Sequence, residues 1–181
     1  MALTAATQYA NRKGLDFKIY AYPKTNGASA LLTIDYVNEV SLDLSSGTVW
    51  ATGGQSHANK IPFNDPMEGT FTVSTQIMTP ELMALISGQD MATWTLGEIT
   101  FNNDVDTPFY VIEGTTTWKD KSGTYYTESV VCHKAAPEKA VNITYTGEGD
   151  PNSMDVVFNL AEDDDGNVYS TSMAVKTGTS A

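Results

Sequence analysis

Apolar and polar residues alternate along much of the chain, which is the pattern of β-strands that bury one face. The clearest segment is 70–78, where Phe71 and Val73 alternate with Thr72 and Ser74. The same period predicts further strands at 15–22, 31–44, 93–101, 109–118, 125–133, 141–146, 154–160 and 168–175. So many strands predict a mainly β protein.

The predicted strand at 31–44 has one strongly acidic side. Asp35, Glu39 and Asp43 alternate there with apolar residues such as Leu42. Because side chains an even number of positions apart share one face of a strand, we expect the three carboxylates on the same side. An open strand face does not bury them, which favours a solvated or pore-facing acidic row over acid–base chemistry.

One helix is predicted, at 80–87. Thr79 is a good N-cap, and Pro80 suits the first helical position. Glu81 complements the positive end of the helix dipole, and Gly88 can end the helix in a left-handed conformation. The residues expected to pack this helix against the strands are Leu82, Leu85 and Ile86.

Segments rich in turn-forming residues separate these elements. Residues 45–68 show little periodicity beyond 48–51 and are too numerous for a simple hairpin, so we expect a long functional loop there. The segments 120–123 and 164–167 are expected to be hairpin connections, because Asp, Gly and Asn favour tight turns.

The fold predicted from these elements is a β-sandwich or barrel with one flanking helix, in a single domain over residues 1–181. Composition predicts weak order at both ends of this domain. We therefore expect residues 1–14 to form an N-terminal arm and residues 176–181 to form a flexible C-terminus.

The chain is acidic, but its charge is uneven. Its 22 acidic and 10 basic residues give a net charge of −12, which disfavours tight binding to nucleic acids or anionic membranes. Residues 1–30 hold four basic residues and one acid, a net +3, whereas residues 137–181 hold eight acids and two basic residues, a net −6. These two regions can pair, within one copy or between copies.

Compartment signals in the sequence are few. Cys132 is the only cysteine, so it can form neither an intramolecular disulfide nor a cysteine-based zinc site. Residues 1–14 lack the apolar core of a signal peptide, and no run approaches the ~18 apolar residues of a membrane helix. We expect a protein that is made and kept in solution, in a reducing compartment.

Motifs for catalysis, metal ions or cofactors are weak. The acidic run 162–167 suggests calcium, but Ala161 and Ser172 stand where an EF-hand loop needs carboxylates, which favours a solvated turn. His57 and His133, the two histidines, lie in no metal or nucleophile motif. We therefore predict no catalytic residue, no metal ion and no cofactor.

Two stretches of the chain carry a family resemblance. Residues 65–88, DPMEGTFTVSTQIMTPELMALISG, lead from a polar loop through a strand into the predicted helix. Residues 139–160 pass through Ile143, Tyr145 and the sequence GEGDP into another strand. Both stretches, and the order of elements over most of the chain, resemble the tail tube proteins (major tail proteins) of bacteriophages.

The resemblance implies a structural subunit and no enzyme. Six copies would form a ring in which the inner sheets join into one β-barrel, and stacked rings would form a hollow tube that conducts DNA during ejection. A negatively charged lumen would let DNA pass without tight binding. Expected partners are further copies of the chain, the tape measure protein in the lumen, and tail terminator and tip or baseplate proteins at the ends. The location would be the virion tail, assembled in the host bacterial cytoplasm, with no membrane contact.

Two sets of residues would serve this role. The first set would face the lumen and comprises Asp35, Glu39, Asp43, Thr72, Ser74 and Gln76. The second would make contacts between rings, from the basic arm and the long loop at 45–68, and comprises Arg12, Lys13, Trp50, His57, Lys60 and Asp65.

A different class of function stays open on the sequence alone. Trp50, Trp94 and Trp118 would form an exposed platform if the chain were a β-sandwich binding module of a tail tip or adhesin that recognises a host surface glycan. Large aromatic residues also serve β-cores and subunit interfaces, and we favour that role for them.

Overall fold

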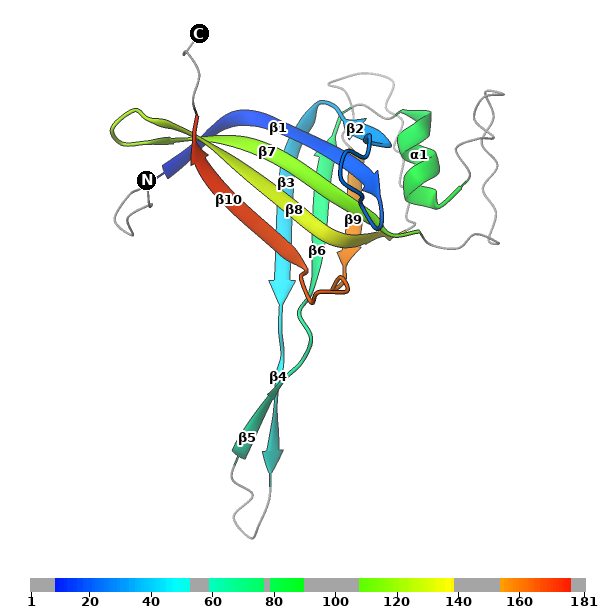
Figure 1. Cartoon of the computed structure of the whole chain (residues 1–181), viewed down its shortest axis with the longest axis vertical. Coiled ribbons are helices and arrows are strands. Elements are labelled where there is room, and N and C mark those ends of the chain that lie inside the picture. The colour runs from blue at the N-terminus through cyan, green and yellow to red at the C-terminus, as the bar shows by residue number, and fades with distance from the viewer. Residues whose placement is uncertain (1–8, 53–58, 77–78, 90–107, 139–153, 177–181) are drawn as a thin grey trace, which may run out of the picture.

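The computed structural model describes residues 9–52, 59–76, 79–89, 108–138 and 154–176, and Figure 1 shows their arrangement. Its strands and single helix are, in chain order, β1 (Tyr9–Ala21), β2 (Leu32–Ile34), β3 (Val37–Ser45), β4 (Thr48–Thr52), β5 (Asn59–Asn64), β6 (Glu68–Thr75), α1 (Pro80–Ser87), β7 (Tyr110–Asp120), β8 (Tyr125–Pro137), β9 (Met154–Leu160) and β10 (Tyr169–Val175). The prediction of a mainly β protein is confirmed.

Eight strands form one antiparallel sheet in the order β2-β1-β7-β8-β9-β6-β3, with β10 also paired to β8. Strand β8 is the branch point: its residues from Tyr126 to Cys132 pair with β10, and those from Ala135 to Pro137 pair with β9. The sheet therefore has two parts, β2-β1-β7-β8-β10 and β9-β6-β3, whose strands run in different directions in Figure 1.

The core lies between these two parts. Phe17 of β1 and Phe71 of β6 are four strands apart in the sheet order, yet their ring centroids are 5.4 Å apart. The sheet must therefore curve, so that β1 approaches β6 across the core. The most deeply buried members of the core include Ile19, Val73, Ile112, Cys132, Val156 and Phe158.

Helix α1 confirms the prediction for 80–87 in both its bounds and its caps. The Thr79 hydroxyl accepts a hydrogen bond from the Leu82 amide at 3.2 Å. Gly88 adopts φ 71°, a left-handed conformation that favours glycine, and its amide donates to the Leu85 carbonyl. The three predicted packing residues, Leu82, Leu85 and Ile86, are at most 2% exposed and belong to the core. Within the described ranges, no helix has the length and apolarity needed to cross a membrane.

The prediction of one strand at 31–44 is wrong. The chain breaks at Asp35 and Tyr36, so that β2 pairs with β1 while β3 pairs with β6 in the other part of the sheet. Tyr36 has φ 54°, which turns the chain. The buried Thr75 hydroxyl donates to the Asp35 carbonyl at 2.8 Å and holds this turn.

Two segments predicted to lie outside the sheet contain strands. Strands β4 and β5 occupy much of the predicted loop at 45–68 and pair with each other as a two-stranded ribbon, with Trp50 opposite Pro62. Figure 1 shows this ribbon projecting away from the rest of the molecule. Residues 9–14 of the predicted arm belong to β1, which pairs with β7 from Tyr9 onwards.

The two predicted hairpin connections differ in outcome. Residues 120–123 do join the hairpin pair β7 and β8, and the Gly123 amide donates to the Asp120 carbonyl. Residues 164–167 form a turn, but it joins β9 and β10, which pair with different parts of β8 and not with each other. The strands predicted at 93–101 and 141–146 lie outside the described residues.

Candidate assembly surface

The outer face of β3, β6 and β9 is a continuous polar surface. The register places Glu39 opposite Ser74 and Ser41 opposite Thr72, and it places Ser74 opposite Asp155 of β9. Directly paired residues of antiparallel strands share a face, so these rows align across the sheet. We call this surface the polar face; its residues are Glu39, Ser41, Asp43, Ser45, Glu68, Thr70, Thr72, Ser74, Asp155, Val157 and Asn159.

The polar face is acidic. It holds Glu39, Asp43, Glu68 and Asp155, and none of its residues is a lysine, arginine or histidine. These four acidic side chains are exposed, whereas Thr72 and Ser74 are half-buried. Four of the six predicted lumen residues, Glu39, Asp43, Thr72 and Ser74, are thus brought together on one surface.

The other two predicted lumen residues lie at its margin. Asp35 is exposed but stands before β3, at the turn next to Tyr36, and so it is not part of the paired rows. The prediction that three carboxylates share one strand face therefore holds for Glu39 and Asp43 only. Gln76 is exposed and follows the last residue of β6.

The polar face ends at an open strand edge. Strand β3 is the last strand of the sheet order, paired with β6 on one side and with no described strand on the other. An edge strand presents unpaired backbone N–H and C=O groups, which can pair with a strand of another chain. A strand of a second copy can therefore pair with β3 and continue the polar face.

The predicted ring-to-ring residues are divided between two regions. Trp50 and Lys60 belong to the ribbon, on β4 and β5 respectively, while His57 lies outside the described residues. Asp65 is exposed at the ribbon's base, where its amide donates to the Gly47 carbonyl at 2.9 Å. Arg12 and Lys13 lie in β1, well before the ribbon in the sequence. Lys13 is paired with Thr117 of β7.

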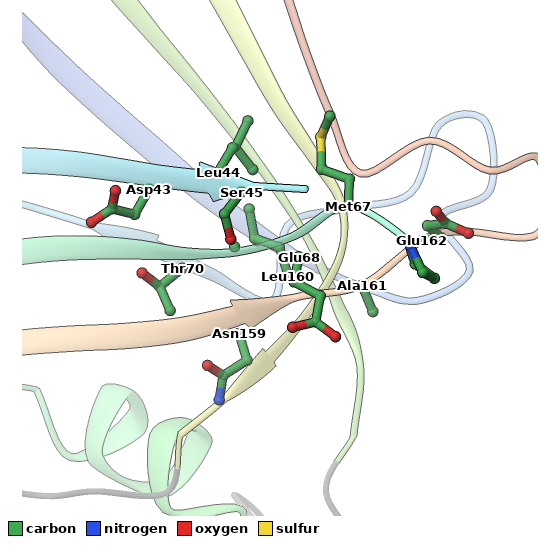
Figure 2. A pocket seen from close by; sticks show the side chains of 12 residues that line it. Asp43, Leu44, Ser45, Met67, Glu68, Thr70, Asn159, Leu160, Ala161 and Glu162 are labelled. Carbon is green, nitrogen blue, oxygen red and sulfur yellow. The ribbon is translucent and has the colours of Figure 1, made fainter. Parts of the chain in front are cut away.

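A hollow of about 640 Å³ lies where β3, β6 and β9 meet the base of the ribbon. Figure 2 shows Leu44, Met67 and Leu160 around it. Leu44 and Met67 are 37% and 43% exposed, which is unusual for large apolar side chains next to a core. The acidic residues Asp43, Glu68 and Glu162 also line the hollow, and no basic residue does.

A polar cluster that sequence reasoning missed joins β8 to the turn before β10. His133 Nδ1 lies 3.3 Å from Asp163 Oδ2, and His133 Nε2 lies 2.9 Å from Ser170 Oγ. Asp163 also accepts hydrogen bonds from the amides of Asp165 and Asn167, which close the turn. Its carboxylate is thereby engaged by the turn, so the solvated-turn interpretation of 162–167 fits the geometry better than a calcium loop does.

We predict that Asp163→Asn removes part of the dependence of stability on pH. The backbone N–H of Asn167, then its side chain and the Asp165 amide, lower the pKa of Asp163 below its ordinary value of 3.8. A lowered pKa stabilises the fold above that ordinary value, and the stabilisation is lost as pH falls through the folded-state pKa. Urea unfolding from pH 6 to pH 3 should therefore show a smaller loss of stability in the variant than in wild type. Equal pH profiles would contradict the assignment.

Trp118 is half-buried, and its indole nitrogen is bonded within the chain. Its indole Nε1 donates to the Glu128 carboxylate at 2.5 Å, and Thr171 donates to the same carboxylate at 2.6 Å. These bonds tie β7, β8 and β10 together on one side of the sheet. The side chain of Trp50 and all of Trp94 lie outside what the structure describes.

Comparison with known proteins does not assign a family. A scan against protein-family models finds no match to the chain. A search of curated proteins likewise finds no match. Functional assignment therefore depends on the geometry described above.

Proposed function

We propose that this chain is a structural subunit of a phage or phage-like tail tube. Copies pair edge to edge into a ring, six to a ring by the family resemblance, and rings stack into a hollow tube. The polar face of β3, β6 and β9 lines the lumen, through which DNA passes during ejection. The ribbon β4–β5 contributes to the contacts between rings.

The observation that carries this proposal is that the acidic polar face ends at β3, which is an edge strand among the described residues. Joining such edges around a ring pairs the exposed backbone groups, which removes an aggregation hazard, and it makes the polar face a continuous inner wall. A wall bearing Glu39, Asp43 and Asp155 from every copy repels phosphate, so that a DNA duplex can slide along it without adhering.

Ring closure would bring the acidic residues of neighbouring copies together. An experiment can therefore test whether their repulsion opposes assembly. We expect the double variant Glu39→Gln/Asp43→Asn to assemble at a lower protein concentration than wild type, because it carries fewer mutually repelling carboxylates. Added salt should promote wild-type assembly for the same reason, since it screens that repulsion. Negative-stain microscopy would identify rings and tubes, and analytical ultracentrifugation would give the concentration at which they form.

The matched control is Asp16→Asn/Asp165→Asn, which removes the same number of charges from exposed positions outside the polar face. It should leave the assembly concentration closer to that of wild type. A wild-type protein that stays monomeric at every concentration would refute the proposal. An equal shift in both double variants would refute the lumen position of the polar face.

A further inference from the structure

Tyr36 combines two unusual properties. Among the residues whose exposure the structure describes, it is the most exposed large apolar or aromatic side chain, at 70%, and it is the one described non-glycine residue with positive φ. Glycine or asparagine would adopt that conformation at lower cost, and an exposed ring adds nothing to the core. A strained residue that presents an aromatic ring to solvent points to a contact outside its own chain.

Hydrogen bonds from β6 and the residue after it hold the backbone at Tyr36. Its carbonyl accepts the Gln76 amide at 3.4 Å, and the preceding carbonyl, that of Asp35, accepts the hydroxyl of Thr75, which is 1% exposed. The turn is thus tied to the end of β6. Tyr36 therefore projects from a fixed position, and a partner gains from this because little side-chain or loop ordering remains to be done on binding.

The hollow lies at the opposite end of the same strand. Tyr36 immediately precedes β3, whereas Leu44 near the end of β3 lines the hollow beside Met67. Leu44 follows Tyr36 by eight residues, so the two are about 26 Å apart at ~3.3 Å per residue of extended strand. Copies placed head to tail along β3 would bring the tyrosine of one against the hollow of the next.

We propose that Tyr36 of one copy inserts into the hollow at the ribbon base of the next copy, which deepens the tail tube proposal and depends on it. The hollow exceeds the ~300 Å³ at which ligand pockets begin, so it can admit one aromatic ring. Leu44, Met67 and Leu160 cover the ring, while Glu68 or Asp43 accepts a hydrogen bond from the tyrosine hydroxyl. A projecting group that fits a pocket elsewhere on the same surface makes a heterologous contact, which propagates along one axis.

The central test uses Tyr36→Gly, which separates folding from assembly. Glycine relieves the positive φ, so the monomer should be at least as stable as wild type, while the protein concentration needed for stacking should rise by roughly 30-fold or more, as for an interface hot spot. Met67→Asp should act similarly from the other side of the contact. Leu31→Ala, which trims another exposed apolar residue, is the matched control and should stack as wild type does.

A photo-crosslinking benzophenone amino acid at position 36 tests the geometry directly. We expect links between copies that mass spectrometry maps to Leu44 or Met67. If Tyr36→Gly forms tubes at the same protein concentration as wild type, or if the links map to other residues, this inference is overturned. The tail tube proposal would still stand. A wild-type protein that never assembles would overturn both.

Discussion

Replacing residues 48–64 with a two-residue Asn-Gly turn is expected to leave the body of the protein folded and to abolish tubes. The backbone permits the excision, because the Asp65 amide already bonds to the Gly47 carbonyl at the ribbon's base. Asn-Gly forms the type I′ turn that closes tight hairpins. Among the described elements, β4 and β5 have more than a few backbone contacts only with each other, so few contacts within the body are lost.

The effect on assembly should be large for the same reason. A two-stranded ribbon alone is marginally stable in water, so one that projects from a folded body would gain stability from a partner in the proposed tubes. Its sequence is suited to that use: residues 48–64 contain Trp50, Ile61, Phe63 and Lys60 but no acidic residue, in a chain of net charge −12. In tubes, the ribbon can therefore lie against the acidic surface of a neighbouring copy.

The measurements are urea unfolding of the excised protein and electron microscopy of its assemblies. Unfolding free energy within about 0.5 kcal/mol of wild type, as for surface changes, would show that the body is intact. Separate rings without tubes are the expected assemblies. A second variant that keeps the ribbon but replaces Trp50 and Phe63 with threonine should weaken stacking by a smaller amount. Tubes of normal length from the excised protein would exclude the ribbon from the contacts between rings.

Local signals account for what could be predicted from the sequence. The caps of α1, Thr79 and Gly88, are only nine positions apart, so the helix and its bounds follow from one short segment. Strand β9 likewise follows from a local signal, the alternation of apolar and polar residues. Its predicted bounds match those observed. The polar rows on β3 and β6 could be predicted as faces, although which strands pair could not.

Contacts between distant residues account for what could not be predicted. The break at Tyr36 is held by Thr75, 40 positions after Asp35, and a tyrosine gives no local signal of positive φ. Pro62 lies within β5, where proline gives no sequence signal of a strand, although it is compatible with a ribbon that has free edges. The contacts of His133 with Asp163 and Ser170 join residues at least 30 positions apart, and no spacing motif marks them.

The largest change in stability is expected from Phe71→Ala. Phe71 is 2% exposed and meets Phe17 from the opposite part of the folded sheet, so its loss leaves a cavity where the two parts meet. Buried phenylalanine-to-alanine changes cost about 3–5 kcal/mol. Thr72→Ala is the matched control, because the neighbouring residue points to the polar face and its loss should change stability by less than about 0.5 kcal/mol.

Cys132 reports this change without further engineering. It is the only cysteine, it is fully buried in the same core, and burial raises the pKa of its thiol to about 12. A thiol reagent attacks the thiolate, so labelling at pH 8 requires the sheet to open first. Because about 1.4 kcal/mol corresponds to a tenfold change, Phe71→Ala should speed labelling by a factor on the order of a hundred to a thousand. An unchanged rate, with a normal unfolding midpoint, would mean that the contact of Phe17 with Phe71 does not hold the two parts of the sheet together.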